Sequence, residues 1–218
     1  MSVVTDLHGG LGRFRAAVAS LRAAQCRHDI DLTEITVPMG PSDSVAFSAT
    51  VTDATDSGYR PEQVAAWHGP TLPATAVASM PRACSDELAT GRFILSHAPS
   101  RRSEWGGEFR IVTFVKAQVE RDLGHDQMLA SVAWSWLLES LDRNGAAYTG
   151  EGGTASRVLA EGFGQLADTG EDIDVELRAS WTPTDQDFGA HLEAWADMVC
   201  TFAGLPPVTD GVVRLTGR

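Results

Sequence analysis

The stretch 126–145 most constrains the fold of this 218-residue chain, because its pattern fits a helix that is packed on several sides. Its middle reads Val-Ala-Trp-Ser-Trp-Leu-Leu over residues 132–138, so apolar side chains cover most of the helical circumference. The polar residues recur nearly every fourth position and form one narrow stripe: Gln127, Ser131, Ser135, Glu139 and Asp142. We therefore expect 126–145 to be the core helix, covered by a sheet.

Two tryptophans of this stretch, Trp134 and Trp136, are expected to face different layers. Residues two positions apart point about 200° apart around an ideal helix. We therefore predict that one tryptophan contacts the sheet. The other then meets a second helix, the segment 53–90, or another molecule.

Two further helices are predicted by apolar seams that alternate steps of four and three residues. The first spans about 7–26, and its seam consists of Leu7, Leu11, Phe14, Val18 and Leu21. The second spans about 187–203, and its seam consists of Phe188, Leu192, Trp195, Val199 and Phe202. Gly204 and Pro206 end the second helix, because neither residue favours its continuation.

Six strands are predicted from runs of β-formers and from apolar residues that alternate with polar ones. Their expected ranges are 29–37, 44–51, 91–97, 108–120, 154–163 and 172–182. The element order is then α-β-β-β-β-α-β-β-α, with a ββα pseudo-repeat over 91–204. We predict an α+β fold, a two-layer sandwich in which helices pack on one face of a mainly antiparallel sheet.

The segment 53–90 is the weak zone of the pattern. It contains four prolines and only one short helical candidate, 61–67. Neither side of it carries enough elements for a separate core. We therefore predict a single domain over 1–218 with a Pro-rich irregular insertion at about 53–90, and such long connections are often functional.

The chain is acidic, with a formal net charge of −12. A field of this sign repels nucleic-acid phosphates and anionic membrane surfaces, so we expect neither partner. The first 28 residues run against the trend: four arginines and one acid, Asp6, leave them at +3, so the remainder is at −15. We favour docking of this segment on the acidic remainder over docking on an acidic partner. The arginines are Arg13, Arg15, Arg22 and Arg27.

Three cysteines, Cys26, Cys84 and Cys200, form no CxxC motif and are an odd number. This usage indicates reduced thiols in a cytosolic protein. There is no signal-peptide pattern and no apolar run of about 18 residues. We therefore expect a soluble, cytoplasmic protein.

Several phrases of the sequence carry a resemblance to a known family. They are Ala133-Trp134-Ser135-Trp136-Leu137, Gly145-Ala146-Ala147-Tyr148-Thr149, Gly152-Gly153-Thr154, Val175-Glu176-Leu177-Arg178-Ala179-Ser180-Trp181-Thr182 and Ala203-Gly204-Leu205-Pro206-Pro207. Over most of its length the chain resembles an uncharacterised actinobacterial family, the domain of unknown function 3000. The resemblance implies no activity, cofactor or catalytic residue.

Motifs of common enzymes are missing from the sequence. There is no GxxxxGK[ST], no GxGxxG that opens a helix and no GxSxG. The glycine-rich stretch 150–154 precedes an expected strand, so we interpret it as a turn. We predict no cofactor and assign no catalytic residue, and whether the protein is an enzyme stays open.

One incomplete metal set occurs near the start of the last helix, with Asp185, Asp187 and His191. Two carboxylates and one histidine do not complete a typical site. Carboxylates at a helix N-terminus also cap its free amides. We therefore favour capping and predict no metal.

Two main functional hypotheses follow, from different classes. The first is a non-catalytic adaptor or homodimer that binds a protein through an aromatic surface, for which the candidates are Trp134, Trp136, Trp67 and Trp105. The second is a small-molecule-binding protein or enzyme whose pocket lies between the sheet and 53–90. Its candidate polar groups are His97, Glu108, Arg110 and Arg178. A third, weaker alternative is RNA binding through the N-terminal arginines.

Overall fold

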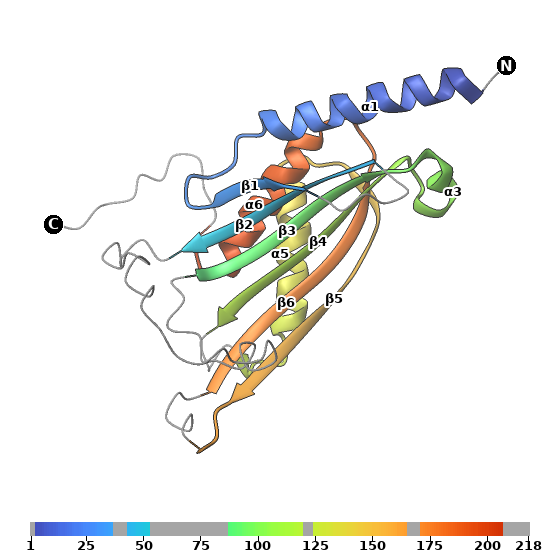
Figure 1. Ribbon diagram of the computed structural model, residues 1–218. Helices are drawn as coiled ribbons and strands as arrows, with labels where there is room; N and C mark the ends of the chain where they lie inside the picture. Colours follow the sequence, from blue (N-terminus) through green and yellow to red (C-terminus); the bar gives the residue numbers. More distant parts are fainter. Residues whose placement is uncertain (1–2, 37–42, 53–86, 120–123, 165–170, 207–218) are drawn as a thin grey trace, which may run out of the picture.

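The protein folds around one six-stranded antiparallel sheet, with strand order β1-β2-β3-β4-β6-β5 (Figure 1). The computed structural model describes residues 3–36, 43–52, 87–119, 124–164 and 171–206. The strands are β1 (Asp31–Ile35), β2 (Asp43–Thr52), β3 (Glu87–His97), β4 (Phe109–Val119), β5 (Tyr148–Glu161) and β6 (Glu171–Pro183). The helices are α1 (Val3–Ala23), the 3-10 turn η2 (Pro99–Arg101), α3 (Arg102–Trp105), α5 (Leu129–Arg143) and α6 (Phe188–Phe202).

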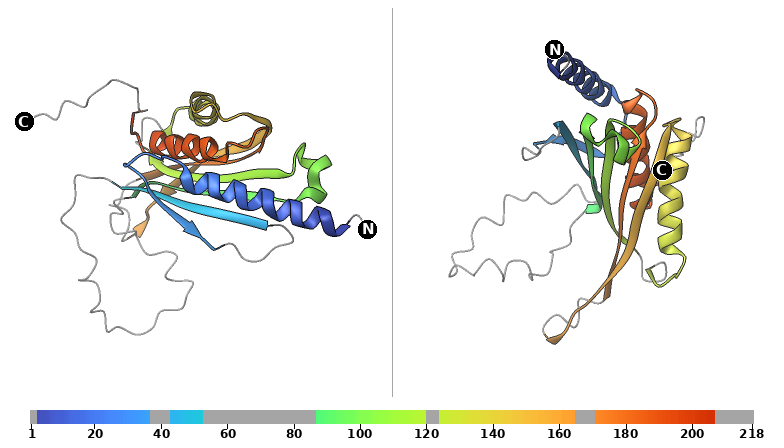
Figure 2. Two further views of the ribbon diagram at one scale, coloured as in Figure 1. Left: turned by 90° about the horizontal axis from the view of Figure 1, so that it is seen from above. Right: turned by 90° about the vertical axis from the view of Figure 1, so that its right-hand side faces the viewer.

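Helices α5 and α6 cover one face of the sheet, and α1 packs beside α6 (Figure 2). The predicted α+β sandwich and its element order are confirmed, with η2 and α3 added between β3 and β4. Among the described residues, no helix combines the length and apolar character that a membrane span requires.

Alternation along the strands decides which side chains enter the core. In β4, Ile111, Thr113, Val115 and Ala117 are buried under the helices, while Val112 between them is exposed on the opposite face. The same alternation along β6 buries Trp181. These inward-facing residues of β4 and β6 form part of the core beneath the helices.

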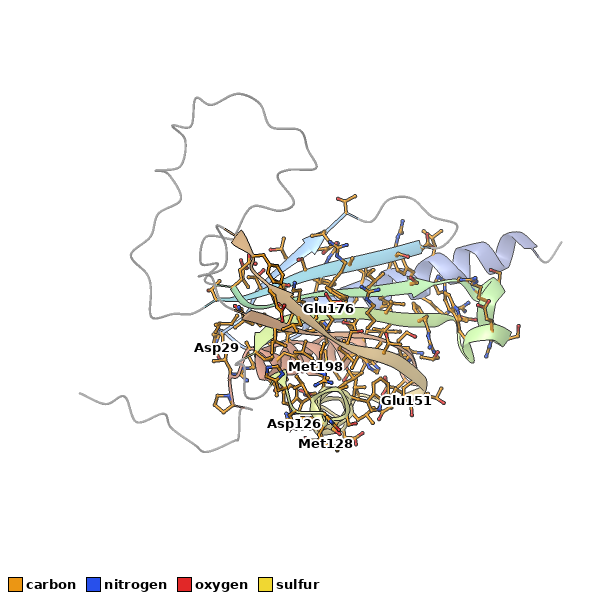
Figure 3. The ribbon with its side chains drawn as sticks, turned by 90° about the horizontal axis from the view of Figure 1, so that it is seen from below. Asp29, Asp126, Met128, Glu151, Glu176 and Met198 are labelled. Carbon is orange, nitrogen blue, oxygen red and sulfur yellow. The ribbon has the colours of Figure 1, made fainter. Side chains whose placement is uncertain are left out.

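The most deeply buried helix is α6, so our assignment of 126–145 as the core helix is wrong. Twelve of the fifteen residues of α6 are buried, against five of fifteen in α5. Figure 3 illustrates the contrast: Met198 of α6 lies inside, whereas Met128, at the start of α5, lies on the outside and is 60% exposed. Helix α6 occupies the space next to the centre of the sheet. Helix α5 is therefore covered on one side only, and apolar residues on its other side, such as Val132, stay exposed.

The two tryptophans of α5 pack in different directions, as predicted. A Cβ added at Gly153 of β5 would lie 2.8 Å from the ring of Trp134, so this ring covers the sheet edge. The ring of Trp136 meets Phe202 of α6, with ring centroids 5.2 Å apart. The second layer that Trp136 contacts is therefore another helix of the same chain.

Two strands are longer than their sequence patterns indicated. β3 begins at Glu87 rather than 91, and β5 begins at Tyr148 rather than 154. The glycine-rich stretch 150–154 is thus part of β5, where the register to β6 shifts between Thr149 and Gly152. The helix expected at 61–67 lies outside the described residues.

Candidate functional site

A pocket of about 460 Å³ lies at one end of the sheet. Three parts of the chain form its walls: α1, the connection from α3 into β4, and the loop between β6 and α6. The lining residues are Arg13, Ala16, Ala17, Arg102, Gly107, Glu108, Phe109, Thr184, Asp185, Gln186 and Phe188. The sequence analysis expected a pocket between the sheet and 53–90. Residues 53–86 lie outside the described residues, and the described lining of this pocket contains no residue of 87–90.

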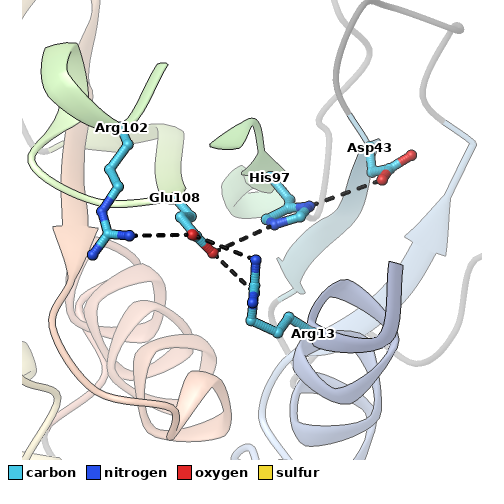
Figure 4. Close-up of polar contacts among 5 residues, drawn as sticks. All are labelled: Arg13, Asp43, His97, Arg102 and Glu108. Carbon is cyan, nitrogen blue, oxygen red and sulfur yellow. Dashed lines mark hydrogen bonds and ion pairs between the residues drawn. The ribbon is translucent and has the colours of Figure 1, made fainter. Parts of the chain in front are cut away.

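Glu108 is the centre of the polar groups at this pocket (Figure 4). Arg13 Nε lies 3.0 Å from Glu108 Oε2, and Arg102 Nη1 lies 3.5 Å from Glu108 Oε1. The Glu108 side chain is 20% exposed, while those of Arg13 and Arg102 are 47% and 73% exposed. One partly buried carboxylate therefore holds two guanidinium groups at the mouth of the pocket.

His97, the last residue of β3, lies behind Glu108 and is almost fully buried. Its Nε2 is 3.9 Å from Glu108 Oε2, and its Nδ1 is 3.9 Å from Asp43 Oδ2. Within the described part of the chain, neither ring nitrogen has a hydrogen-bond partner. The ring lies between Phe14 of α1 and Phe109 of β4, at centroid distances of 6.0 and 4.6 Å.

The surroundings of His97 hold it neutral. Burial lowers the pKa of His97 below its ordinary value of 6.5, the carboxylates of Glu108 and Asp43 oppose this shift, and Arg13 adds to it. The two carboxylates therefore favour the protonated ring of His97, whereas burial disfavours it.

Only two of the four polar candidates from the sequence come together at this pocket, namely His97 and Glu108. Arg110 lies on the face opposite to α5 and α6, where it donates to Gly150 O at 2.9 Å and Ser180 Oγ at 2.7 Å. Burial there lowers the pKa of Arg110. Arg178 is on the same face as Arg110, with its guanidinium over the ring of Phe114 at 5.4 Å.

The tryptophan candidates do not form one surface in the described part of the chain. Trp105 is half-buried in α3, and its carbonyl accepts a hydrogen bond from Thr182 Oγ1 at 2.6 Å. Trp134 and Trp136 are half-buried against Gly153 and Phe202. Trp67 lies outside the described residues.

Sequence reasoning did not assign Arg102, Asp43 or Asp185 to this site, and it assigned Arg13 to docking on the acidic remainder or, as a weaker alternative, to RNA binding. No local spacing signals the pair Arg13–Glu108, because 95 positions separate the two residues. Only the docking of α1 on α6 brings them together.

The arginine-rich N-terminal segment docks on the acidic remainder, as favoured from the sequence. Besides Arg13, Arg22 pairs with Glu34 at 2.8 Å, and Arg27 pairs with Asp29 at 2.7 Å. Ser20 Oγ also accepts the backbone amide of Gly189 of α6 at 3.0 Å. Three of the four arginines are therefore neutralised within the chain.

Asp187 of the incomplete metal set caps α6, as predicted, and Asp185 holds the turn before it. Asp187 Oδ1 accepts the Ala190 amide at 3.2 Å, and Asp185 Oδ1 accepts the Asp187 amide at 3.0 Å. His191 points into the core instead, where its Nδ1 accepts a hydrogen bond from Trp181 Nε1. Over the described ranges, no group of three or more ligand-type side chains could hold a metal ion.

Comparison with known proteins identifies the family but no activity. Neither a curated protein nor a solved structure matches the chain. The model of one family, described as protein of unknown function (DUF3000), matches residues 12–213, which include every residue of the pocket. The chain therefore belongs to the DUF3000 family, as the resemblance in its sequence indicated.

Proposed function

We propose that this protein is a cytoplasmic small-molecule-binding protein whose ligand occupies the pocket between α1, the α3–β4 connection and the β6–α6 loop. The observation that carries the proposal is the pocket itself. Its volume of about 460 Å³ falls in the range of about 300–1,000 Å³ that is typical of ligand sites.

The walls of the pocket combine apolar surface with a few convergent polar groups, as ligand sites do. Ala16 and Ala17 of α1 face Phe109 and Phe188, whose rings lie 4.7 Å apart. Arg13 contributes an exposed guanidinium at the mouth. Apolar surface supports affinity, and the charged groups orient the ligand.

The two free cysteines among the described residues support the assignment to the cytoplasm. Cys26 is half-buried and Cys200 is buried, and both are reduced thiols. Burial raises the pKa of the Cys26 thiol to about 12, so the thiol resists oxidation. A reducing compartment accords with this usage.

The adaptor function stays a second candidate, with less support. Trp134 and Trp136 pack against Gly153 and Phe202, so they offer only part of their surface to a partner. What favours a partner is the outer side of α5, where Met128 and Val132, one turn apart, are 60% and 38% exposed.

Binding of the fluorescent apolar probe N-phenyl-1-naphthylamine tests the proposed function. We expect saturable binding of one probe molecule per chain. Ala16→Trp should abolish it, because Ala16 lines the pocket and is exposed to it. Ala19→Trp is the matched control, since Ala19 is exposed on the same helix but does not line the pocket.

Two results would overturn the proposal. One is the absence of saturable binding to the native chain. The other is equal binding by Ala16→Trp and Ala19→Trp, which would place the probe outside the pocket. Native mass spectrometry of the protein purified from its own host should also show a retained small molecule that Ala16→Trp loses.

A further inference from the structure

The charges around His97 balance only while the pocket holds no charged ligand. Arg13 of α1 and Arg102 of α3 carry +2, Glu108 and Asp43 carry −2, and a neutral His97 adds nothing. These four are the charged groups whose contacts converge on Glu108 and His97 in the described structure (Figure 4). A negative ligand that joins Arg13 and Arg102 leaves the cluster with one excess negative charge.

The two guanidinium groups retain donors for such a ligand. Each guanidinium carries five N–H groups. Arg13 directs those on Nε and Nη2 towards Glu108, and Arg102 directs those on Nη1 towards the same carboxylate. Their remaining N–H groups make no other hydrogen bond to the residues that the structure describes. Arginine donors in this forked arrangement suit a carboxylate, phosphate or sulfonate.

We propose that the pocket binds an organic anion, and that binding is coupled to the uptake of one proton by His97. The anion accepts hydrogen bonds from the remaining N–H groups of Arg13 and Arg102, and its negative charge weakens the attraction of both arginines for Glu108. Glu108 then turns to His97 Nε2 and pairs with the protonated ring. This inference rests on the proposed function, because it concerns the same pocket.

The distances support a small movement. Glu108 Oε2 is already 3.9 Å from His97 Nε2, and a charge-assisted hydrogen bond needs about 2.8 Å. A shift of about 1 Å therefore completes the pair. Asp43 lies at the same distance from Nδ1, so the second ring nitrogen also gains a carboxylate partner on protonation.

The buried ring explains why the proton is absent without a ligand. Burial disfavours the charged imidazolium, and the positive charge of Arg13 adds to this effect. An anion on Arg13 offsets that positive charge. Asp185 is an exposed carboxylate in the β6–α6 wall of the pocket, and its charge repels an anion. Its Oδ1 accepts the Asp187 amide, which holds the side chain in place.

A pair of matched probes tests the coupling. 8-Anilinonaphthalene-1-sulfonate has the same rings as N-phenyl-1-naphthylamine and adds a permanently ionised sulfonate. Between about pH 8 and about pH 6 we expect the Kd of the sulfonate to fall about tenfold, because one proton is taken up with it. The Kd of the neutral probe should stay constant, which also excludes a change in folding.

Calorimetry in two buffers with different ionisation enthalpies then counts the protons. We expect the native chain to take up between about 0.3 and 1 proton per sulfonate bound near pH 7. An uptake of zero, or a pH dependence shared by both probes, would overturn the coupling. Binding of the neutral probe with no gain from the sulfonate would overturn the anion class but leave the proposed function intact.

Variants identify the groups that act. Glu108→Gln should bind the sulfonate more tightly than the native chain at about pH 8 and should lose the pH dependence, because an amide neither neutralises the arginines nor pairs with His97. A purely structural Glu108 would instead weaken binding of both probes. Glu104→Gln is the control, since Glu104 carries the same charge on α3 but pairs with Arg101, outside the pocket.

His97→Gln provides a second test of the same step. It should retain the affinity that the native chain shows at about pH 8 and should not gain affinity at about pH 6. A normal gain in this variant would show that another group takes up the proton, and the inference would be wrong.

Discussion

Among the described residues, His97 and His191 are both almost fully shielded from solvent, but their surroundings differ. His191 of α6 is completely buried beside Trp181, whose Nε1 donates to His191 Nδ1 at 3.1 Å. His97 is 3% exposed, and both of its nitrogens face carboxylates at 3.9 Å without a hydrogen bond. Burial lowers the pKa of both rings.

The difference shows that neighbouring groups, and not burial alone, decide what a buried histidine does. The hydrogen-bond partner of His191 is a neutral indole, and the charges of Asp185 and Asp187 oppose the fall in its pKa but leave it at about 4, so protonation there costs stability. The partners of His97 are carboxylates beside an open pocket, so protonation there is compensated and responds to a ligand. Each prediction below separates the closed region around His191 from the adjustable region around His97.

The largest expected effect is that of Trp195→Ala in the closed region. Trp195 is fully buried, with its ring 5.6 Å from that of Phe93. Its removal should lower the free energy of unfolding by about 3–5 kcal/mol. Phe14→Ala, which removes the half-buried ring stacked on His97, should cost less than half as much, as urea denaturation would measure. Equal losses would mean that the two regions are equally rigid.

The next largest expected effect is that His191 lowers the free energy of unfolding in acid. The pKa of His191 is lowered from 6.5 to about 4 in the folded protein, mainly by burial. The unfolded chain therefore binds the proton more strongly, so this stability is complete above pH 6.5 and declines as pH falls towards 4. The total loss is about 3 kcal/mol.

The variant His191→Gln isolates this term, because Gln accepts the Trp181 hydrogen bond but does not titrate. Its free energy of unfolding should fall by about 3 kcal/mol less than that of the native chain between pH 7 and 4. A parallel decline in both proteins would assign the acid sensitivity to other groups.

Two glycine substitutions compare the packing of the two regions. At Gly91 an added Cβ would meet Trp195 at 2.7 Å and Val199 at 3.2 Å, so Gly91→Ala should cost about 1–3 kcal/mol. At Gly10 of α1 an added Cβ would meet only His97 Cε1, at 3.4 Å. Gly10→Ala should be neutral or should stabilise by up to about 1 kcal/mol, because alanine favours the helix. Thermal unfolding would measure both, and a loss at Gly10 as large as that at Gly91 would contradict the comparison.

The smallest expected effect is the difference between Glu108 and Asp43 in their influence on the pKa of His97. Both carboxylates raise the pKa of His97, and the charge of Glu108, whose side chain is 20% exposed against 52% for Asp43, has the larger of the two charge effects. Asp43→Asn should therefore lower the pKa of His97 less than Glu108→Gln does. NMR titration of the ring would measure both shifts, and the reverse order would make Asp43 the main partner.

The sequence predicts most of the fold because its patterns are local. Alternation in β4 and β6 and the apolar seams of α1 and α6 each follow from the period of one element. The first residues of β5 could not be predicted in this way, because Gly150, Gly152 and Gly153 are typical of a turn. They form a strand there only because β6 supplies the pairing partner.

The candidate site is predictable only in part, for the same reason. His97 and Glu108 could be grouped because they lie where β3 and β4 pair, with His97 opposite Phe109. Arg110 was grouped with them wrongly, because β4 begins at Phe109 and Glu108 lies in the preceding connection, where strand alternation does not apply. Arg13 requires the docking of α1, which its seam does not specify.

The most direct test of the difference between the two regions is an NMR titration of both histidines with and without 8-anilinonaphthalene-1-sulfonate. We expect the sulfonate to raise the pKa of His97 by about 1.5 units and that of His191 far less. An unchanged pKa of His97 in the saturated complex, or equal shifts at both histidines, would contradict the coupling between the pocket and His97.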